Sequence, residues 1–179
     1  MASAFTHAVV ALAIGDIVPT QTKGWRYWTL GVFCAVIPDA DALGYWWGVP
    51  YDSLWGHRGI THSFFFAVLL AVVVMRLFYP SIKLNSRTWW SLFCFFMLST
   101  ASHSILDACT TGGLGVAFFA PFDTTRYFLP WRVIKVSPIG ISSFFSSWGL
   151  RVIVSEIIWV WLPCLVLIVI VRKLKGFKD

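Results

Sequence analysis

The sequence predicts an all-α fold, a polytopic membrane helix bundle with about five transmembrane helices and a long, partly ordered outer loop. Of its 179 residues, 58% are hydrophobic and only 12% are charged, whereas about a quarter of the residues in a typical soluble domain are charged. A soluble protein of this size could not bury so much apolar surface, so we expect a bilayer to be its main solvent. The length fits one integral membrane domain over residues 1–179.

The first two predicted spans are irregular. Residues 2–18 are apolar but form a short segment that contains His7 and Asp16. Residues 26–47 have aromatic clusters at both ends, about 20 residues apart, as expected for a helix that meets both interfaces of one bilayer. This second segment also contains Pro38, which lacks a backbone donor and kinks or ends a helix.

The other predicted spans are more regular. Residues 59–78 and 88–108 carry almost no charge, and residues 152–171 hold Glu156 as their only charged residue before a basic tail. The connection over residues 111–150 is rich in glycine, proline and aromatic residues. Its aromatic side chains argue against disorder, so we expect it to lie at the membrane interface or to fold back over the bundle.

The net charge of +6 is interpreted as a topology signal, and no nucleic-acid partner is expected. With the N-terminus outside, nine Lys and Arg residues face the cytoplasm and five face outward, which agrees with the positive-inside rule. The N-terminus has no basic region, so we expect no cleaved signal peptide. The four cysteines form no C-x-x-C pair and indicate neither a zinc ribbon nor a disulfide framework.

Alternating spans bring the histidines and most of the acidic side chains to one face of the membrane. All four histidines and three aspartates belong to this set, with Asp52 and Asp123 placed more loosely. An Asp or His at membrane depth costs a few kcal/mol unless it is paired or hydrated, and a metal ion offsets this cost by binding carboxylate and imidazole directly. His103 and Asp107 are spaced i and i+4, hence on one helical face. The expected metal ligands are His7, Asp39, Asp41, His62, His103 and Asp107.

Such mixed ligands suit a divalent metal, with zinc favoured over manganese or iron, and their number allows one or two ions. Each residue also has a purely structural alternative. Asp107 could pair with Arg126 or Arg58. The two aspartates after Pro38 could cap a short helix, and Thr61 could cap the third span. These alternatives explain the residues one by one but not their gathering on one side, so a metal site is favoured.

Three motifs of this set resemble the YdjM-like family. They are Pro38-Asp39-Ala40-Asp41, His57-Arg58-Gly59-Ile60-Thr61-His62-Ser63 and His103-Ser104-Ile105-Leu106-Asp107. The resemblance covers roughly residues 1–145, and the His-Arg-Gly-x-Thr-His-Ser block is its most specific part. The family is described as LexA-binding metal-dependent hydrolases of the bacterial inner membrane. We take the LexA term to refer to a damage-regulated promoter and infer no contact with LexA.

The resemblance implies a membrane-embedded, metal-dependent hydrolase of the bacterial inner membrane. The positive-inside count places the N-terminus and the site of this multi-pass chain on the periplasmic side. A looser similarity to zinc-dependent phospholipase C enzymes favours a phosphoester, or another ester, of a lipid or lipid-linked substrate. Membrane lipids are therefore the expected partners. The expected catalytic residues are Asp41 or His57 as general base and Arg58 as a stabiliser of developing negative charge. Asp41 could instead bind a second ion, and Arg58 with Arg126 would bind the substrate.

Two other functions remain open. One is a transporter of a metal ion or proton, which the sequence disfavours because the inner halves of the spans offer little beyond Asp16 and Glu156. The other is a noncatalytic membrane scaffold with a structural metal, which would have a closed coordination sphere. Serine-based catalysis ranks lower, since the sequence has no G-x-S-x-G motif.

Overall fold

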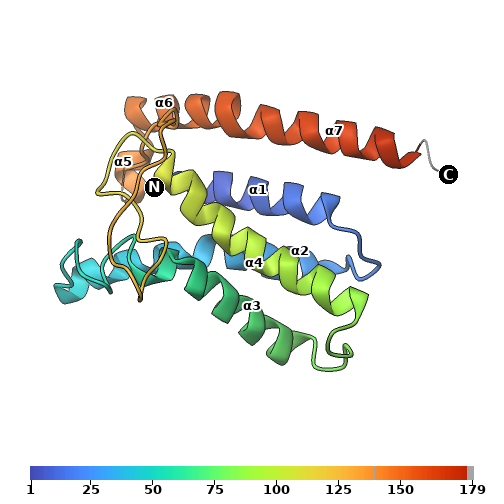
Figure 1. Ribbon diagram of the computed structural model, residues 1–179. Helices are drawn as coiled ribbons and strands as arrows, with labels where there is room; N and C mark the ends of the chain where they lie inside the picture. Colours follow the sequence, from blue (N-terminus) through green and yellow to red (C-terminus); the bar gives the residue numbers. More distant parts are fainter. Residues whose placement is uncertain (139, 177–179) are drawn as a thin grey trace.

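The computed structural model describes residues 1–138 and 140–176, which form an all-helical bundle without β-strands (Figure 1). This confirms the predicted all-α class. The α-helices are α1 (Ala4–Ile17), α2 (Trp25–Val36), α3 (Phe64–Phe78), α4 (Arg87–Ala108), α5 (Ile141–Phe144), α6 (Ser147–Glu156) and α7 (Leu162–Gly176). A 3-10 segment, Ile37–Trp47, follows α2, and a 3-10 turn, Ile60–His62, precedes α3. A π-helical turn, Ile157–Trp161, joins α6 to α7.

Serine side chains begin several of these helices. The Ser63 hydroxyl accepts a hydrogen bond from the Phe66 amide at 3.0 Å, and the Ser86 hydroxyl accepts one from the Trp89 amide at 3.1 Å. Each serine thereby satisfies one of the amides that the first turn of a helix leaves unpaired. The cap of the third predicted span is therefore Ser63, two residues beyond Thr61, which leaves the Thr61 hydroxyl free for another partner.

Fewer helices are long enough to cross a membrane than the five predicted. By length and composition two qualify within the described residues, namely α4 and the continuous helix Ser147–Lys175. The other three are shorter, with 14 residues in α1, 12 in α2 and 15 in α3. The second predicted span breaks at Ile37 because Pro38 cannot donate the next α-helical hydrogen bond. The third begins five residues later than predicted, at Phe64, and the last begins five residues earlier, at Ser147.

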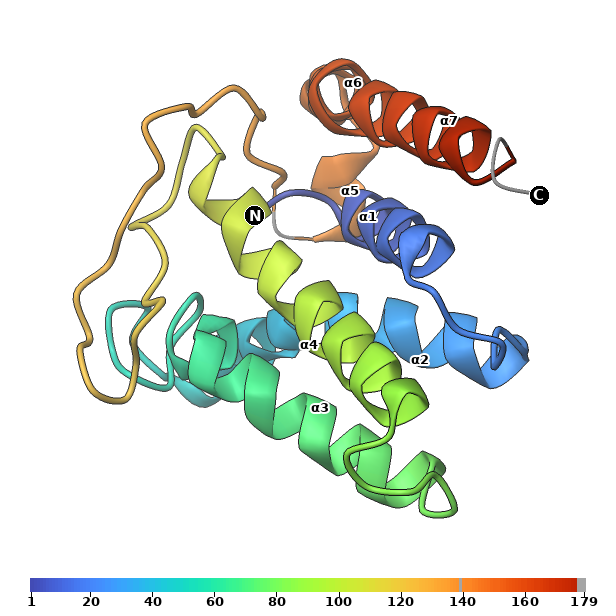
Figure 2. The same ribbon diagram turned by 45° about the vertical axis from the view of Figure 1, so that its right-hand side comes forward.

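The helices lie roughly along one long direction, and α4 packs on α1, α2 and α3, while α1 also packs on α2 (Figure 2). The α7 helix packs on α1. The first residues of the chain, the 3-10 segments and the end of α4 lie at one end of the bundle (Figure 1). The α1–α2 and α3–α4 connections lie at the other end, toward which α7 also runs. Side chains placed at the first end by different helices can therefore meet.

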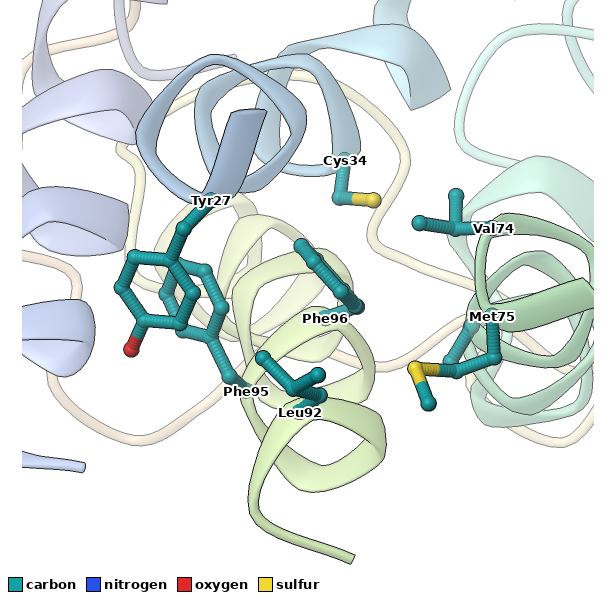
Figure 3. Packing of buried hydrophobic residues seen from close by; sticks show 8 residues of the cluster. Tyr27, Cys34, Val74, Met75, Leu92, Phe95 and Phe96 are labelled. Carbon is teal, nitrogen blue, oxygen red and sulfur yellow. The ribbon is translucent and has the colours of Figure 1, made fainter. Parts of the chain in front are cut away.

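The main hydrophobic core lies between α2, α3 and α4 (Figure 3). Its labelled members are Tyr27, Cys34, Val74, Met75, Leu92, Phe95 and Phe96. The Tyr27 ring stacks on Phe95 with centroids 4.1 Å apart, and its hydroxyl donates a hydrogen bond to the Gly15 carbonyl at 2.9 Å. A Cβ atom at Gly31 would overlap the Phe95 ring, so glycine is what allows α2 to approach α4 this closely.

The outer faces of the bundle are apolar. On α7 the side chains of Leu165, Val166, Leu167, Val169 and Ile170 are all exposed. Soluble monomers rarely expose continuous apolar patches larger than a few hundred Å². A lipid environment explains this surface, because lipid tails replace the missing protein contacts.

The loop between α4 and α5 folds back over the first end of the bundle, one of the two arrangements expected from its sequence. The Phe118 carbonyl accepts a hydrogen bond from the Phe64 amide at 2.9 Å, and the two rings stack with centroids 5.1 Å apart. The Leu129 amide donates to the Ala108 carbonyl at 3.0 Å. The loop is thus attached to the start of α3 and the end of α4, where the polar residues gather.

Candidate metal centre

The predicted metal ligands lie together at the first end of the bundle, delivered by separate segments of the chain. They are His7 of α1, Asp39 and Asp41 of the 3-10 segment after α2, His62 of the 3-10 turn before α3, and His103 and Asp107 of α4. Two looser candidates do not join them. Asp52 is exposed, and the Asp123 carboxylate accepts hydrogen bonds from Thr125 and Tyr127 in the loop.

Four of these residues form a compact group. The ligand atoms of Asp39, His62, His103 and Asp107 all lie within 4.8 Å of one another. The Asp39 Oδ1 atom lies 3.4 Å from His103 Nε2 and 3.7 Å from His62 Nε2, and Asp107 Oδ2 lies 3.6 Å from His62 Nε2. Tetrahedral bonds of about 2.0–2.2 Å to zinc would place ligand atoms about 3.3–3.6 Å apart. The spacing of the group therefore fits one small divalent ion.

The hydrogen bonds behind the two histidines set their tautomers. His103 Nδ1 lies 2.7 Å from the Ala35 carbonyl oxygen, which can only accept, so Nδ1 carries the proton. His62 Nδ1 lies 3.1 Å from Asp41 Oδ2, which assigns the proton to Nδ1 in the same way. Both Nε2 atoms then present lone pairs, and they face each other at 3.0 Å. Such tautomer-fixing partners are typical of metal-binding histidines.

Several atoms that face this group have no hydrogen-bond partner among residues 1–138 and 140–176. They are both carboxylate oxygens of Asp39, Oδ2 of Asp107 and both ring nitrogens of His7. Leaving the Asp39 carboxylate buried and unpaired would cost more than the roughly 1–3 kcal/mol lost by a neutral group. A bound cation would satisfy the carboxylates and the two Nε2 lone pairs together. The residues therefore fit a divalent metal.

His7 lies beside the four-residue group rather than within it. Its ring stacks on His103 with centroids 3.8 Å apart, and its Nε2 atom lies 3.6 Å from Asp107 Oδ1. The side chain is fully buried. His7 is thus placed to complete a coordination sphere or to hold the neighbouring ligands in position.

Asp41 differs from Asp39, although the two carboxylates are only two residues apart. Its carboxylate oxygens accept hydrogen bonds from His57 Nδ1 and from the Thr61 hydroxyl, each at 2.6 Å. The Arg58 amide, at 3.1 Å, and His62 Nδ1 complete its surroundings. Asp41, His57 and His62 form a second group that could hold an ion. With four donors already on its carboxylate, however, Asp41 is better suited to orient the two histidines.

The Arg58 side chain is fully buried and turned toward protein acceptors. Its Nε atom lies 3.1 Å from Asp107 Oδ2, and its other nitrogens donate to the Gly112 carbonyl at 2.9 Å and the Thr110 hydroxyl at 3.0 Å. The residue has a φ of 64°, in the left-handed region. Of the structural alternatives for Asp107, the structure thus shows pairing with Arg58. This contact is compatible with metal binding, because a carboxylate has several lone pairs.

Arg126 lies outside the four-residue group and stabilises the loop before His57. It donates hydrogen bonds to the carbonyl oxygens of His57 at 2.9 Å and Tyr51 at 2.8 Å. Its guanidinium also lies over the Tyr51 ring, 5.4 Å from the centroid. Burial lowers the pKa of Arg126 and raises the pKa of Tyr51. Near neutral pH the pair is therefore a cation against a neutral ring, and it fixes the segment that carries His57.

Sequence reasoning missed the part that Glu156 plays at this end of the bundle. Glu156 was expected on the inner half of the last span, but it is fully buried against Ser3. Its carboxylate accepts the Ser3 hydroxyl at 2.6 Å and the Ser3 amide at 2.5 Å, while the Ala2 amide donates to Asp107 at 2.7 Å. The start of α1 thus links Glu156 to a candidate ligand. The sequence feature that could have indicated this function is that Glu156 is the only acidic residue in an apolar span.

Comparisons with known proteins identify related membrane proteins. A family model described as "YdjM inner membrane protein" matches residues 1–176. The chain is 41% identical over 170 residues to the inner membrane protein YbcI of Escherichia coli strain K12, which covers 93% of this chain and 95% of that protein. No solved structure matches. The family resemblance carried by the three sequence motifs is confirmed.

Proposed function

The chain belongs to the YdjM inner membrane protein family, and from this premise we propose that it is a metal-dependent hydrolase embedded in the inner membrane. Its substrate in this proposal is a phosphoester or another ester of a lipid or a lipid-linked molecule. One observation carries the metal site: buried carboxylate and imidazole atoms of Asp39, His62, His103 and Asp107 converge, and both oxygens of Asp39 lack a protein donor among the described residues. Zinc is the ion that this donor set suits best.

A divalent ion at this site would supply a Lewis acid and lower the pKa of water to about 7. The residues of the chain would coordinate the ion and accept the proton that the attacking water loses. His57 is the proposed general base, because the contact between its Nδ1 atom and Asp41 leaves Nε2 available to accept a proton. Asp41 would orient His57 and His62 together. Arg58 would neutralise and position Asp107, since its donors are directed to protein acceptors.

The proposed topology has five membrane-crossing segments, with the N-terminus and the metal centre on the periplasmic side. The α1 and α3 helices have 14 and 15 residues and therefore rise only about 21–22 Å, less than the roughly 30 Å of a hydrocarbon core. In this topology their site-bearing ends stop below the headgroups. The loop after α4 would cover them, and the candidate ligands would sit within reach of a lipid ester.

The proposal predicts that hydrolysis requires the metal. Purified protein should be stripped with a chelator, reloaded with Zn²⁺, Mn²⁺ or Fe²⁺, and assayed against a panel of phospholipids and lipid phosphates. We expect the stripped protein to lose activity and at least one ion to restore it, because water is not activated without the ion. Mock-treated protein is the control. Activity that survives complete removal of the metal, or metal-loaded protein that cleaves no member of the panel, would contradict the proposal.

A structural metal is the second candidate, and one specific observation favours it. Four protein ligands are available, which is the number that closes a tetrahedral structural site. Hydrolysis instead needs an open coordination position. The Asp39 side chain is 10% exposed, but both of its carboxylate oxygens are buried. A chain that unfolds when stripped of metal, yet cleaves no ester when loaded, would support the structural function.

Replacing Asp41 with asparagine is expected to weaken metal binding by about 10–100-fold, the usual cost of losing a partner that orients a ligand. The four groups around Asp41 are donors or protonated nitrogens, and an amide offers only one acceptor oxygen to them. The affinity should be measured by competition with a chelator in detergent. The matched control is Asp52→Asn, at an exposed acid of a nearby loop. Equal affinities of Asp41→Asn and wild type would refute the orienting role.

A further inference from the structure

An apolar groove borders the proposed metal centre at Asp39. It is a cavity of about 780 Å³ between α1 and α2, lined by Leu12 of α1, by Trp28, Val32, Phe33 and Val36 of α2, and by Asp39. Among its described lining residues Asp39 is the only charged one. A candidate metal ligand thus forms one end of a groove whose walls are almost entirely hydrocarbon.

The groove runs along the direction that a lipid tail takes in the bilayer. From Trp28 to Val36 it follows α2 for eight residues, a rise of about 12 Å. Its lining starts at Trp28, one turn into α2, and ends in the 3-10 segment, which lies at the site-bearing end of the bundle. In the proposed topology this direction runs from the bilayer interior toward the headgroups. A tail lying in the groove would therefore bring its ester end to Asp39.

The lining of the groove suits a hydrocarbon chain better than a polar substrate. Sites for small polar molecules place several hydrogen-bonding groups on the ligand, whereas the polar side chains here are Thr29 and Asp39. The volume falls within the range of about 300–1,000 Å³ that is usual for ligand sites. Because the chain belongs to an inner membrane protein family, lipid is also the apolar molecule that surrounds it at the highest concentration.

A neighbouring cavity does not offer the same path. It has a volume of about 420 Å³, shares Leu12 and Trp28 with the groove, and continues between α1 and α7. It ends at Asp16 and Arg172, whose side chains pair at 2.6 Å. This cavity leads away from the metal centre toward a charged pair, so it cannot position an ester at the candidate ligands.

We propose that the groove between α1 and α2 binds one hydrocarbon tail of a membrane lipid and so positions the ester of that lipid at the metal centre. The inference rests on the proposed function, since it names the part of the substrate that the chain recognises. The tail binds through apolar contact along α2, and the metal centre acts on the bond at its end. The groove thereby selects substrates that carry a long aliphatic chain.

Photolabelling tests the groove without requiring catalysis. The probe is phosphatidylglycerol with a diazirine in one acyl chain, incorporated into vesicles with the full chain, and the labelled residues are mapped by mass spectrometry. We expect labelling of Val32 and Phe33 to exceed that of Leu69, an exposed residue on the outer face of α3, and to be reduced by unlabelled lipid. If the groove and Leu69 are labelled equally and unlabelled lipid does not compete, the labelling reports only the lipid that surrounds the protein. This result would overturn the proposal.

The second part of the test is a variant whose larger side chain fills the groove. Val32→Trp should lower groove labelling about tenfold, equivalent to about 1.4 kcal/mol, or nearly two buried methylene groups. Leu69→Trp is the matched control and should label as wild type. Metal content should stay unchanged in both variants, which shows that the centre is intact. Undiminished labelling of the groove in Val32→Trp would overturn the proposal.

The two proposals can fail separately. If the groove is labelled but metal-loaded protein cleaves no lipid ester, the hydrolase proposal fails and tail binding stands. If lipid esters are cleaved and Val32→Trp reduces cleavage of long-chain and short-chain esters equally, tail recognition fails and hydrolysis stands. We expect Val32→Trp to reduce cleavage of the long-chain ester only.

Discussion

His62→Ala and Asp107→Ala are expected to purify without the metal that the wild-type chain retains. Each substitution removes one of the four ligand atoms that lie within 4.8 Å of one another. Loss of a partner behind a ligand already costs about 10–100-fold in metal affinity, so loss of a ligand itself should cost more than about 100-fold. Elemental analysis after size-exclusion chromatography measures the content, and titration against a chelator measures the affinity.

The control for these variants is Asp52→Asn, which changes an exposed acid outside the cluster and should keep the wild-type metal content. Thermal unfolding in detergent shows whether the two alanine variants remain folded. Folded variants with full metal content would refute the assignment of His62 and Asp107 as ligands. Loss of metal from Asp52→Asn as well would show that the content does not report on the site.

Arg58→Met is expected to destabilise the metal-free protein by about 3–5 kcal/mol, the usual cost of removing one partner from a buried ion pair. The Asp107 carboxylate is fully buried, and Arg58 Nε lies 3.1 Å from its Oδ2 atom. The variant also leaves the Gly112 carbonyl without a charged donor. Unfolding of chelator-treated protein in detergent, monitored by tryptophan fluorescence, measures the change.

The double variant Arg58→Met, Asp107→Asn distinguishes an ion pair from simple packing. Removing the unpaired charge should recover part of the lost stability, so the two effects should not add. If the double variant is destabilised by the full sum of the single effects, Arg58 does not act through Asp107. Unchanged stability of Arg58→Met alone would contradict the pairing outright.

Much of the candidate site could be predicted from the sequence, because the cost of ionisable groups in an apolar chain makes each one conspicuous. The six predicted ligands, His7 through Asp107, lie at one end of the bundle as alternating helix direction requires. Their separate functions could not be predicted in the same way. Asp39 and Asp41 look equivalent in the sequence, yet the first faces the group without donors while the second is surrounded by them.

The helix lengths also could be predicted only in part from the sequence. Each of the five predicted segments contains a helix of the structure, but hydropathy overestimated the number of helices that could span a bilayer, since two are long enough within the described residues. Hydropathy averages over a window and is insensitive to single breaks. Pro38 ends α2 and starts the 3-10 segment that carries both aspartates. The break that shortens the helix is therefore also what brings Asp39 to the centre.

The sequence by itself determined the apolar all-helical character of this chain, its family, and the set of side chains from which a metal centre could be built. These properties follow from composition and local motifs, which need no knowledge of contacts. Only the tertiary structure decided which nitrogen of His62 and of His103 is free, that Arg58 neutralises Asp107, that Glu156 holds the start of α1, and that an apolar groove ends at Asp39. Each of these depends on groups far apart in the chain, and their energies arise only when folding removes them from water or lipid and places them within a few ångströms of one another.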